Sequence, residues 1–201
     1  ISIECFSRLR TYFGECFETM QAMKHLDFES KDGKAPGGFM YPLYEIGVPF
    51  IYMNAVGSQR DVVTMVHEGG HAIHSFLSRD LEMTEFKSTP SEVAELASMS
   101  MELLSMDHWN IFYLNNSELK RAKLEQLEKA LETLPWVASI DKFQHWIYTT
   151  KHTAKERKEK WLEISAKLGN QIIDWEGNEN VHANLWQRQL HLYEVPFYYV
   201  E

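Results

Sequence analysis

Cysteine is scarce in this chain, and its placement limits the cellular setting. Cys5 and Cys16 are the only two among 201 residues, and both fall on one predicted helix spanning 3–26. Their separation of eleven positions corresponds to about 16 Å along a helix, too far for a disulfide. The sequence therefore predicts two free, buried thiols in a reducing compartment, and with them a cytoplasmic location.

Long apolar runs and an excess of basic charge are missing as well. No apolar run approaches the roughly 20 residues that cross a bilayer, and no charged-then-apolar leader opens the chain. The formal net charge is -9, and no basic stripe is present that could follow phosphates. We therefore expect neither a membrane nor a nucleic acid as a partner.

What the chain does contain is typical of a globular domain. Hydrophobic residues make up 44% of it, enough for a sizeable core in a chain of this length. Ile1 already lies in a predicted amphipathic helix, and Glu201 ends an aromatic-rich segment, without a cap or tail at either end. The sequence thus predicts one domain over 1–201 that is a fragment of a longer polypeptide.

Apolar spacing predicts a mainly α-helical fold with a short β-hairpin. Spacings of three and four define the first helix, 3–26. Two aromatic and β-branched segments, 39–43 and 49–54, predict the strands of a hairpin. An extended peptide could pair with the free edge of that hairpin through main-chain hydrogen bonds.

Later helices follow from the same spacing. Pro135 and Gly169 are expected to stop two of them. Core-facing leucines are expected at Leu119, Leu124, Leu127 and Leu131. The predicted ranges are 91–114, 117–134, 136–152 and 154–168.

An HExxH signature, His67 to His71, follows the predicted hairpin. On a helix the two histidines lie one turn apart on one face and can hold one metal ion. Glu68 is rotated away from that face and is placed to act as general base on a zinc-bound water. A solvated helix face is the alternative explanation, because chance alone produces the motif.

A third ligand should come from the next helix. There Thr89 fits an N-cap, Pro90 the first helical position and Glu92 the partner in a capping box, so Glu92 is assigned a structural role. Glu95, one turn further, is the carboxylate left for the metal. Glu102, seven residues beyond on the same face, is expected to contact a ligand rather than the ion.

His74 competes for the third ligand position. Seven residues of helix rise place it about 10.5 Å from His67 along the axis. With metal bonds of roughly 2 Å, these two rings can hardly close on the same ion as His71.

The last segment carries His191 and two adjacent tyrosines. Pro196 is expected to start a helix with Tyr198 and Tyr199 in its first turn. A tyrosine hydroxyl donates a hydrogen bond without carrying charge, which suits an oxyanion opposite a metal. Aromatic core packing is the competing explanation.

Together these residues resemble the catalytic half of oligoendopeptidase F, in the thimet oligopeptidase superfamily of zinc metallopeptidases, over nearly the whole chain. The resemblance implies a zincin-like helical fold with a deep channel, one zinc ion and cleavage of short peptides. It implies that His67, His71 and Glu95 ligate zinc, that Glu68 is the base, and that His191 and Tyr199 stabilise the tetrahedral intermediate. The matching segments are 33–39, 67–75, 90–95 with Glu102, and 191–199.

Family members are longer, with a large helical portion before this region and a further active-site tyrosine after it. The chain is therefore predicted to be the catalytic domain of a zinc metalloendopeptidase, without its N-terminal helical part and extreme C-terminus. The alternative is a non-catalytic helical fragment that binds peptides and keeps a vestigial metal site.

Overall fold

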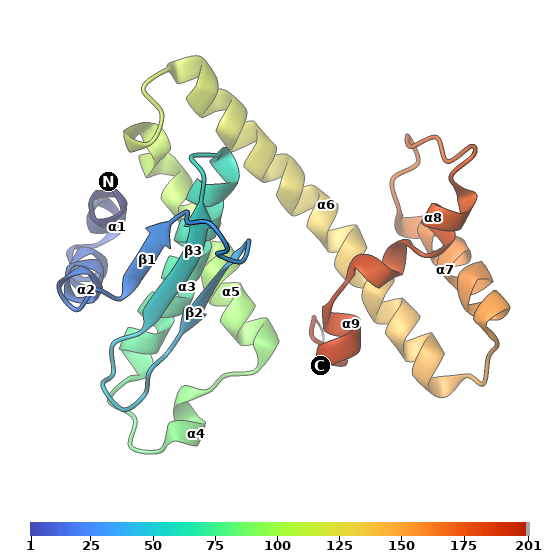
Figure 1. Cartoon of the computed structure of the whole chain (residues 1–201), viewed down its shortest axis with the longest axis horizontal. Helices are drawn as coiled ribbons and strands as arrows, with labels where there is room; N and C mark the ends of the chain where they lie inside the picture. The colour runs from blue at the N-terminus through green and yellow to red at the C-terminus, as the bar shows by residue number, and fades with distance from the viewer. Residues whose placement is uncertain (200–201) are drawn as a thin grey trace. The chain divides into compact units, whose positions relative to one another are not determined.

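A computed structural model describes residues 1–199 and divides the chain into two compact units (Figure 1). Unit 1 is Ile1–Gln126 and unit 2 is Leu127–Glu201. Each unit has its own hydrophobic core. Helices dominate both, and a small sheet lies in unit 1, which confirms the expected mainly α-helical class.

Unit 1 packs its helices on both sides of the HExxH helix. A short 3-10 helix, η1 (Met106–Ile111), follows α5, and the first part of α6 completes the unit. Its helices are α1 (Ser2–Leu9), α2 (Thr11–Ala22), α3 (Gln59–Ser78), α4 (Thr84–Lys87), α5 (Ser91–Ser105) and α6 (Asn116–Thr149).

The sheet has three strands in the order β1-β3-β2 and packs against α3 (Figure 1). Strands β2 (Gly38–Tyr41) and β3 (Phe50–Ala55) pair antiparallel, which confirms the predicted hairpin. Strand β1 (Leu26–Glu29) pairs parallel with β3 and was not predicted. The sequence of β1, LDFE, alternates apolar and polar residues, a strand signal that was missed because the first helix was predicted to run to residue 26.

The single helix predicted over 3–26 is wrong, because Arg10 adopts an extended conformation and separates α1 from α2. The two helices pack on each other, and the Phe6 and Phe17 rings stack with centroids 4.0 Å apart. A Cβ on Gly14 would lie 2.9 Å from Ser7 Cβ, so this glycine permits the close approach. Apolar residues that would line one straight helix instead face each other across a helical pair.

Unit 2 is built on the later part of α6. It adds α7 (Ala154–Leu168), α8 (Glu179–Ala183), a short 3-10 helix η2 (Leu185–Arg188) and α9 (His191–Glu194). Its core joins α6 residues, among them the buried Ile140 and Phe143, to Trp161 of α7 and Trp186 of η2.

Two expectations for α6 are wrong. The helix does not stop at Pro135 but continues through it. Leu131, whose carbonyl loses its partner to the proline, is 71% exposed, so water can satisfy that carbonyl. The leucines at 124, 127 and 131 are at least half exposed and line no core within the described residues.

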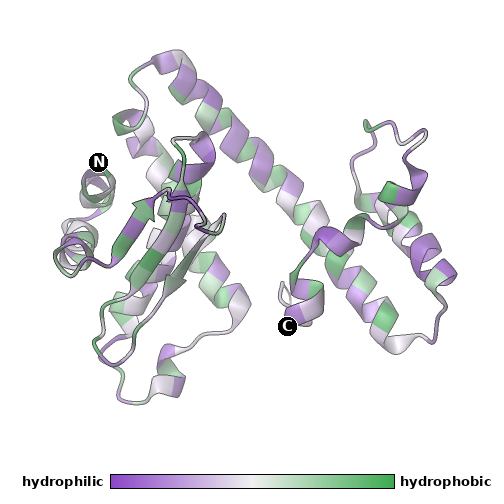
Figure 2. Cartoon of the chain, viewed as in Figure 1, coloured by the Kyte–Doolittle hydropathy of each residue, from purple (hydrophilic) through white to green (hydrophobic). Residues whose placement is uncertain are grey.

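Figure 2 shows hydrophilic and hydrophobic residues alternating along the whole of α6. Within residues 1–199, every helix is too short or too polar to cross a bilayer.

The two thiols provide a test of the unit 1 core. Cys5 and Cys16 are free and buried, and burial raises the pKa of the Cys5 thiol to about 11. Burial also raises the pKa of Cys16. Because thiolate is the reactive form, we expect neither cysteine to react with a thiol reagent at neutral pH in the native protein. Both should react in concentrated guanidinium chloride, and rapid native labelling would contradict this packing.

Candidate metal centre

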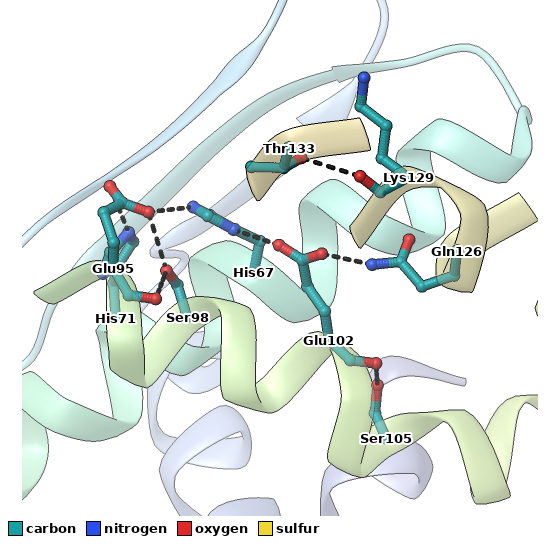
Figure 3. A network of polar contacts seen from close by, with 9 residues as sticks. All are labelled: His67, His71, Glu95, Ser98, Glu102, Ser105, Gln126, Lys129 and Thr133. Atoms are coloured by element: carbon teal, nitrogen blue, oxygen red, sulfur yellow. Dashed lines mark hydrogen bonds and ion pairs between the residues drawn. The ribbon is translucent and has the colours of Figure 1, made fainter. Parts of the chain in front are cut away.

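The signature helix α3 begins at a capping box. Ser58 is the N-cap, and its amide donates to Asp61 Oδ2 at 2.7 Å. The amide of Val56 donates to the same oxygen at 3.0 Å. Further along this helix, His67 and His71 point toward α5 (Figure 3).

Two glycines between the histidines allow close packing on both sides of α3. A Cβ on Gly70 would lie 2.7 Å from Ser98 Cα in α5. A Cβ on Gly69 would lie 2.2 Å from Phe6 Cζ in α1. Neither position accommodates a side chain, so the Gly-Gly pair brings α5 and the helical pair α1–α2 close to the signature helix.

The predicted start of α5 needs a correction. Pro90 is the N-cap rather than the first helical residue, and the cap receives no side-chain hydrogen bond. Thr89 therefore lies one position before the cap, and the proposed capping box with Glu92 does not form. Glu92 is exposed and lies one helical turn before Glu95, and among the described residues the group that could hold a metal contains Glu95 instead.

The third predicted ligand does meet the two histidines (Figure 3). Glu95 Oε2 lies 3.3 Å from His67 Nε2, and Glu95 Oε1 lies 3.8 Å from His71 Nε2. One ligand atom from each of the three residues falls within 4.8 Å of the others. Tetrahedral zinc with bonds of about 2 Å needs ligand atoms on the order of 3.3 Å apart, so this donor set fits zinc.

Further polar side chains hold these groups in place (Figure 3). His67 Nδ1 lies 2.6 Å from Glu102 Oε1, so this ring uses its second nitrogen for a carboxylate. The Ser98 hydroxyl donates to Glu95 Oε2 at 3.1 Å. Such contacts fix the tautomer and direction of metal ligands, and Glu102 has the place predicted for it beside a ligand.

The carboxylates dominate the electrostatics around His67. Burial lowers the pKa of its ring, but hydrogen bonds to Glu102 and Glu95 outweigh burial and raise it to about 10. Burial lowers the pKa of His71. The carboxylates beside His67 thus favour positive charge at this position.

Glu68 occupies a different environment from the other acids. It is 7% exposed, and burial raises its pKa to about 7. The Met40 amide in β2 hydrogen-bonds to its carboxylate and opposes that rise. A carboxyl group with a pKa near neutrality can both accept and return a proton.

The other predicted site residues are not part of the group formed by His67, His71 and Glu95. His74 is not part of the group of three ligands among the described residues. His191 and the tyrosines belong to unit 2, where the His191 ring stacks on Tyr198 with centroids 3.8 Å apart and meets Tyr199 edge-on at 5.9 Å. Residues 196–199 form a turn instead of the predicted helix start.

Sequence reasoning missed three contributors to this centre. Gly70 carried a signal, because a glycine inside a helix costs stability and often marks close packing. Ser98 follows Glu95 by three residues, a spacing at which helical side chains meet. Gln126, which donates to Glu102 Oε2 at 2.5 Å, is distant in sequence and has no local signal.

Two histidines one turn apart, a buried glutamate between them and a carboxylate from a second helix define an HExxH metal centre. A family model, Peptidase family M3, matches residues 14–201. The chain therefore belongs to peptidase family M3.

Individual relatives agree with this assignment. Oligopeptidase PepF of Bacillus subtilis (strain 168) is 30% identical over 128 residues, which are 62% of this chain and 18% of that protein. The chromosomal oligoendopeptidase F of Lactococcus lactis subsp. cremoris is 34% identical over 77 residues, 38% of this chain and 13% of that protein. The solved structure of PZ peptidase A with inhibitor 2 has a TM-score of 0.87 and 32% identity, covering 98% of this chain and 35% of that one. The chain thus matches less than a fifth of these two sequence relatives and about a third of the solved structure.

Gly70→Ala tests the close crossing of α3 and α5. Alanine in an unconstrained helix stabilises by up to about 1 kcal/mol over glycine, whereas overpacking against Ser98 should destabilise by about 1–3 kcal/mol. We expect a lower free energy of unfolding, measured with denaturant, and weaker zinc binding as Glu95 moves away. Leu77→Ala, at an exposed α3 position, should change the free energy of unfolding by no more than about 0.5 kcal/mol. A stabilised Gly70→Ala protein would exclude the crowded crossing.

Proposed function

We propose that the chain is the catalytic domain of a zinc metalloendopeptidase that hydrolyses short peptides. The observation that carries this proposal is the meeting of His67, His71 and Glu95, with ligand atoms within 4.8 Å of one another. Glu68 lies beside them, buried and with a raised pKa. Membership of peptidase family M3 supports peptides as the substrate class.

In this mechanism His67, His71 and Glu95 would hold the ion. A zinc ion held by these three residues would supply Lewis acidity for the hydrolysis. Glu68 takes the proton from the attacking water and returns it to the leaving amine. The Met40 amide, which hydrogen-bonds to the Glu68 carboxylate, would restrain this side chain during both transfers.

Strand β2 supports recognition of an extended peptide. It is an edge strand of the sheet, paired with β3 on one side. Main-chain groups on its other side can pair with a substrate backbone, which selects for peptide rather than for sequence. The same strand carries Met40, so binding at this edge would bring the substrate toward Glu68.

His191 and Tyr199 complete the proposal as donors to the oxyanion of the tetrahedral intermediate. The resemblance to oligoendopeptidase F implies these roles, and Tyr198 is the neighbouring candidate. The stack of His191 on Tyr198 favours Tyr198 as a support for the imidazole, which leaves Tyr199 as the hydroxyl donor.

We also propose a cytoplasmic location. Both cysteines are free and buried, as expected in a reducing compartment.

A peptide-binding fragment without turnover is the second candidate. It is favoured by the share of the solved relative that the chain spans, 35%, since a peptidase channel needs walls from elsewhere. A quenched fluorescent peptide distinguishes the two: cleavage with zinc present supports the enzyme, and binding without cleavage supports the fragment.

Glu68→Gln should abolish turnover and leave zinc bound. Glutamine keeps the shape of the side chain but cannot take a proton, so we expect at least about a hundredfold loss of peptidase activity. Zinc content, measured by elemental analysis, should equal that of the unchanged protein, whereas His67→Ala should lose zinc. An active Glu68→Gln protein would remove Glu68 from the role of base.

Glu95→Ala and Glu92→Ala form a matched pair on α5. Removing Glu95 takes a ligand from the metal, so the zinc affinity measured by chelator competition should fall strongly. Glu92 is exposed and makes no cap, so Glu92→Ala should keep its zinc affinity and change stability by no more than about 0.5 kcal/mol. The opposite order of affinities would make Glu92 the third ligand.

A further inference from the structure

A buried glutamine lies next to Glu102, on the side away from His67 (Figure 3). Gln126 of α6 is only 4% exposed, and its Nε2 lies 2.5 Å from Glu102 Oε2. The other oxygen of the same carboxylate lies 2.6 Å from His67 Nδ1. Three side chains, from helices α6, α5 and α3, are therefore connected by two successive hydrogen bonds. The last of the three is His67, a candidate zinc ligand.

The geometry points to Gln126 as a positioning residue for the metal centre, acting on His67 through Glu102. This inference rests on the proposed zinc site. Gln126 itself neither ligates the ion nor touches the substrate.

The chemistry of the three side chains fixes which group donates and which accepts in each of these hydrogen bonds. An ionised carboxylate only accepts hydrogen bonds, so the glutamine must present its amide N–H to Glu102. Glu102 in turn accepts from His67 Nδ1–H, which leaves Nε2 of the same ring as the free lone pair for a metal. The amide of Gln126 thus favours the tautomer of His67 that a metal ligand needs.

The burial of Glu102 explains why its hydrogen bond from Gln126 is important. The Glu102 side chain is 13% exposed, so little water is available to replace a lost partner. Without the amide donor, the carboxylate can rotate, and its second oxygen loses its hydrogen bond. His67 would then be less firmly directed at the ion, although its own hydrogen bond to Glu102 remains possible.

Gln126→Met removes the donor and keeps the length of the side chain. The control is Gln144→Met, because Gln144 is also buried, at 2%, and its partner is the Phe197 amide at 2.8 Å. We expect zinc affinity, measured by chelator competition, to fall about tenfold in Gln126→Met and to stay unchanged in the control. The visible spectrum of the cobalt-substituted protein should change only in Gln126→Met, because it reports ligand geometry.

A double-mutant cycle tests the route through Glu102. Glu102→Ala alone should lower zinc affinity by about 10–100-fold. Adding Gln126→Met to it should cause no further loss, since the residue that transmits the effect is already absent. Additive losses would overturn the route through Glu102.

Three other outcomes would also overturn the inference, and each has a different meaning. If the unchanged protein binds no zinc, the proposed metal centre fails and the role of Gln126 fails with it. If the unchanged protein binds zinc and Gln126→Met matches it in affinity and cobalt spectrum, the metal centre stands and Gln126 is a packing residue only. Equal loss in Gln126→Met and Gln144→Met would assign the effect to general destabilisation.

Discussion

The close crossing of α3 and α5 at Gly70 is the constraint on which the centre depends. Histidines on α3 and a glutamate on α5 can share one ion only if the two helix backbones nearly touch. Gly70 permits that approach, because a Cβ there would lie 2.7 Å from Ser98 Cα. The same contact places Ser98 where its hydroxyl reaches Glu95. A single missing side chain thus sets both the distance between the ligands and the direction of one of them.

This crossing also concentrates negative charge. Glu68, Glu95 and Glu102 all act on His67, whose pKa rises to about 10 although burial opposes the rise. Carboxylates that are close to one another and partly buried favour the binding of a cation between them. A divalent ion would balance more of this charge than one proton does, and the ring nitrogens and carboxylate oxygens suit zinc. Metal binding and the packing of α3 on α5 are therefore expected to support each other.

The sequence predicts the parts of this centre that depend on helix periodicity and fails where tertiary packing decides. The spacing of His67 and His71 follows from helix periodicity, whereas Glu95 was chosen because an expected capping box assigned Glu92 a structural role. Glu92 was set aside for the wrong reason, since no capping box forms and Glu92 is an exposed residue one turn before Glu95. The break at Arg10 escaped prediction because it depends on how Gly14 lets α2 pack against α1, a contact between helices.

Helix α6 also shows that apolar periodicity does not decide which residues are buried. Apolar periodicity predicts that Leu124, Leu127 and Leu131 face a core, yet all three are at least half exposed while Gln126 is buried. No local pattern marks that glutamine, because its partner Glu102 lies 24 positions earlier. Burying a polar side chain costs free energy unless its hydrogen bonds are made, so its burial requires a specific partner. Gln126 therefore marks where α6 meets the candidate metal centre, which the apolar spacing of the helix does not reveal.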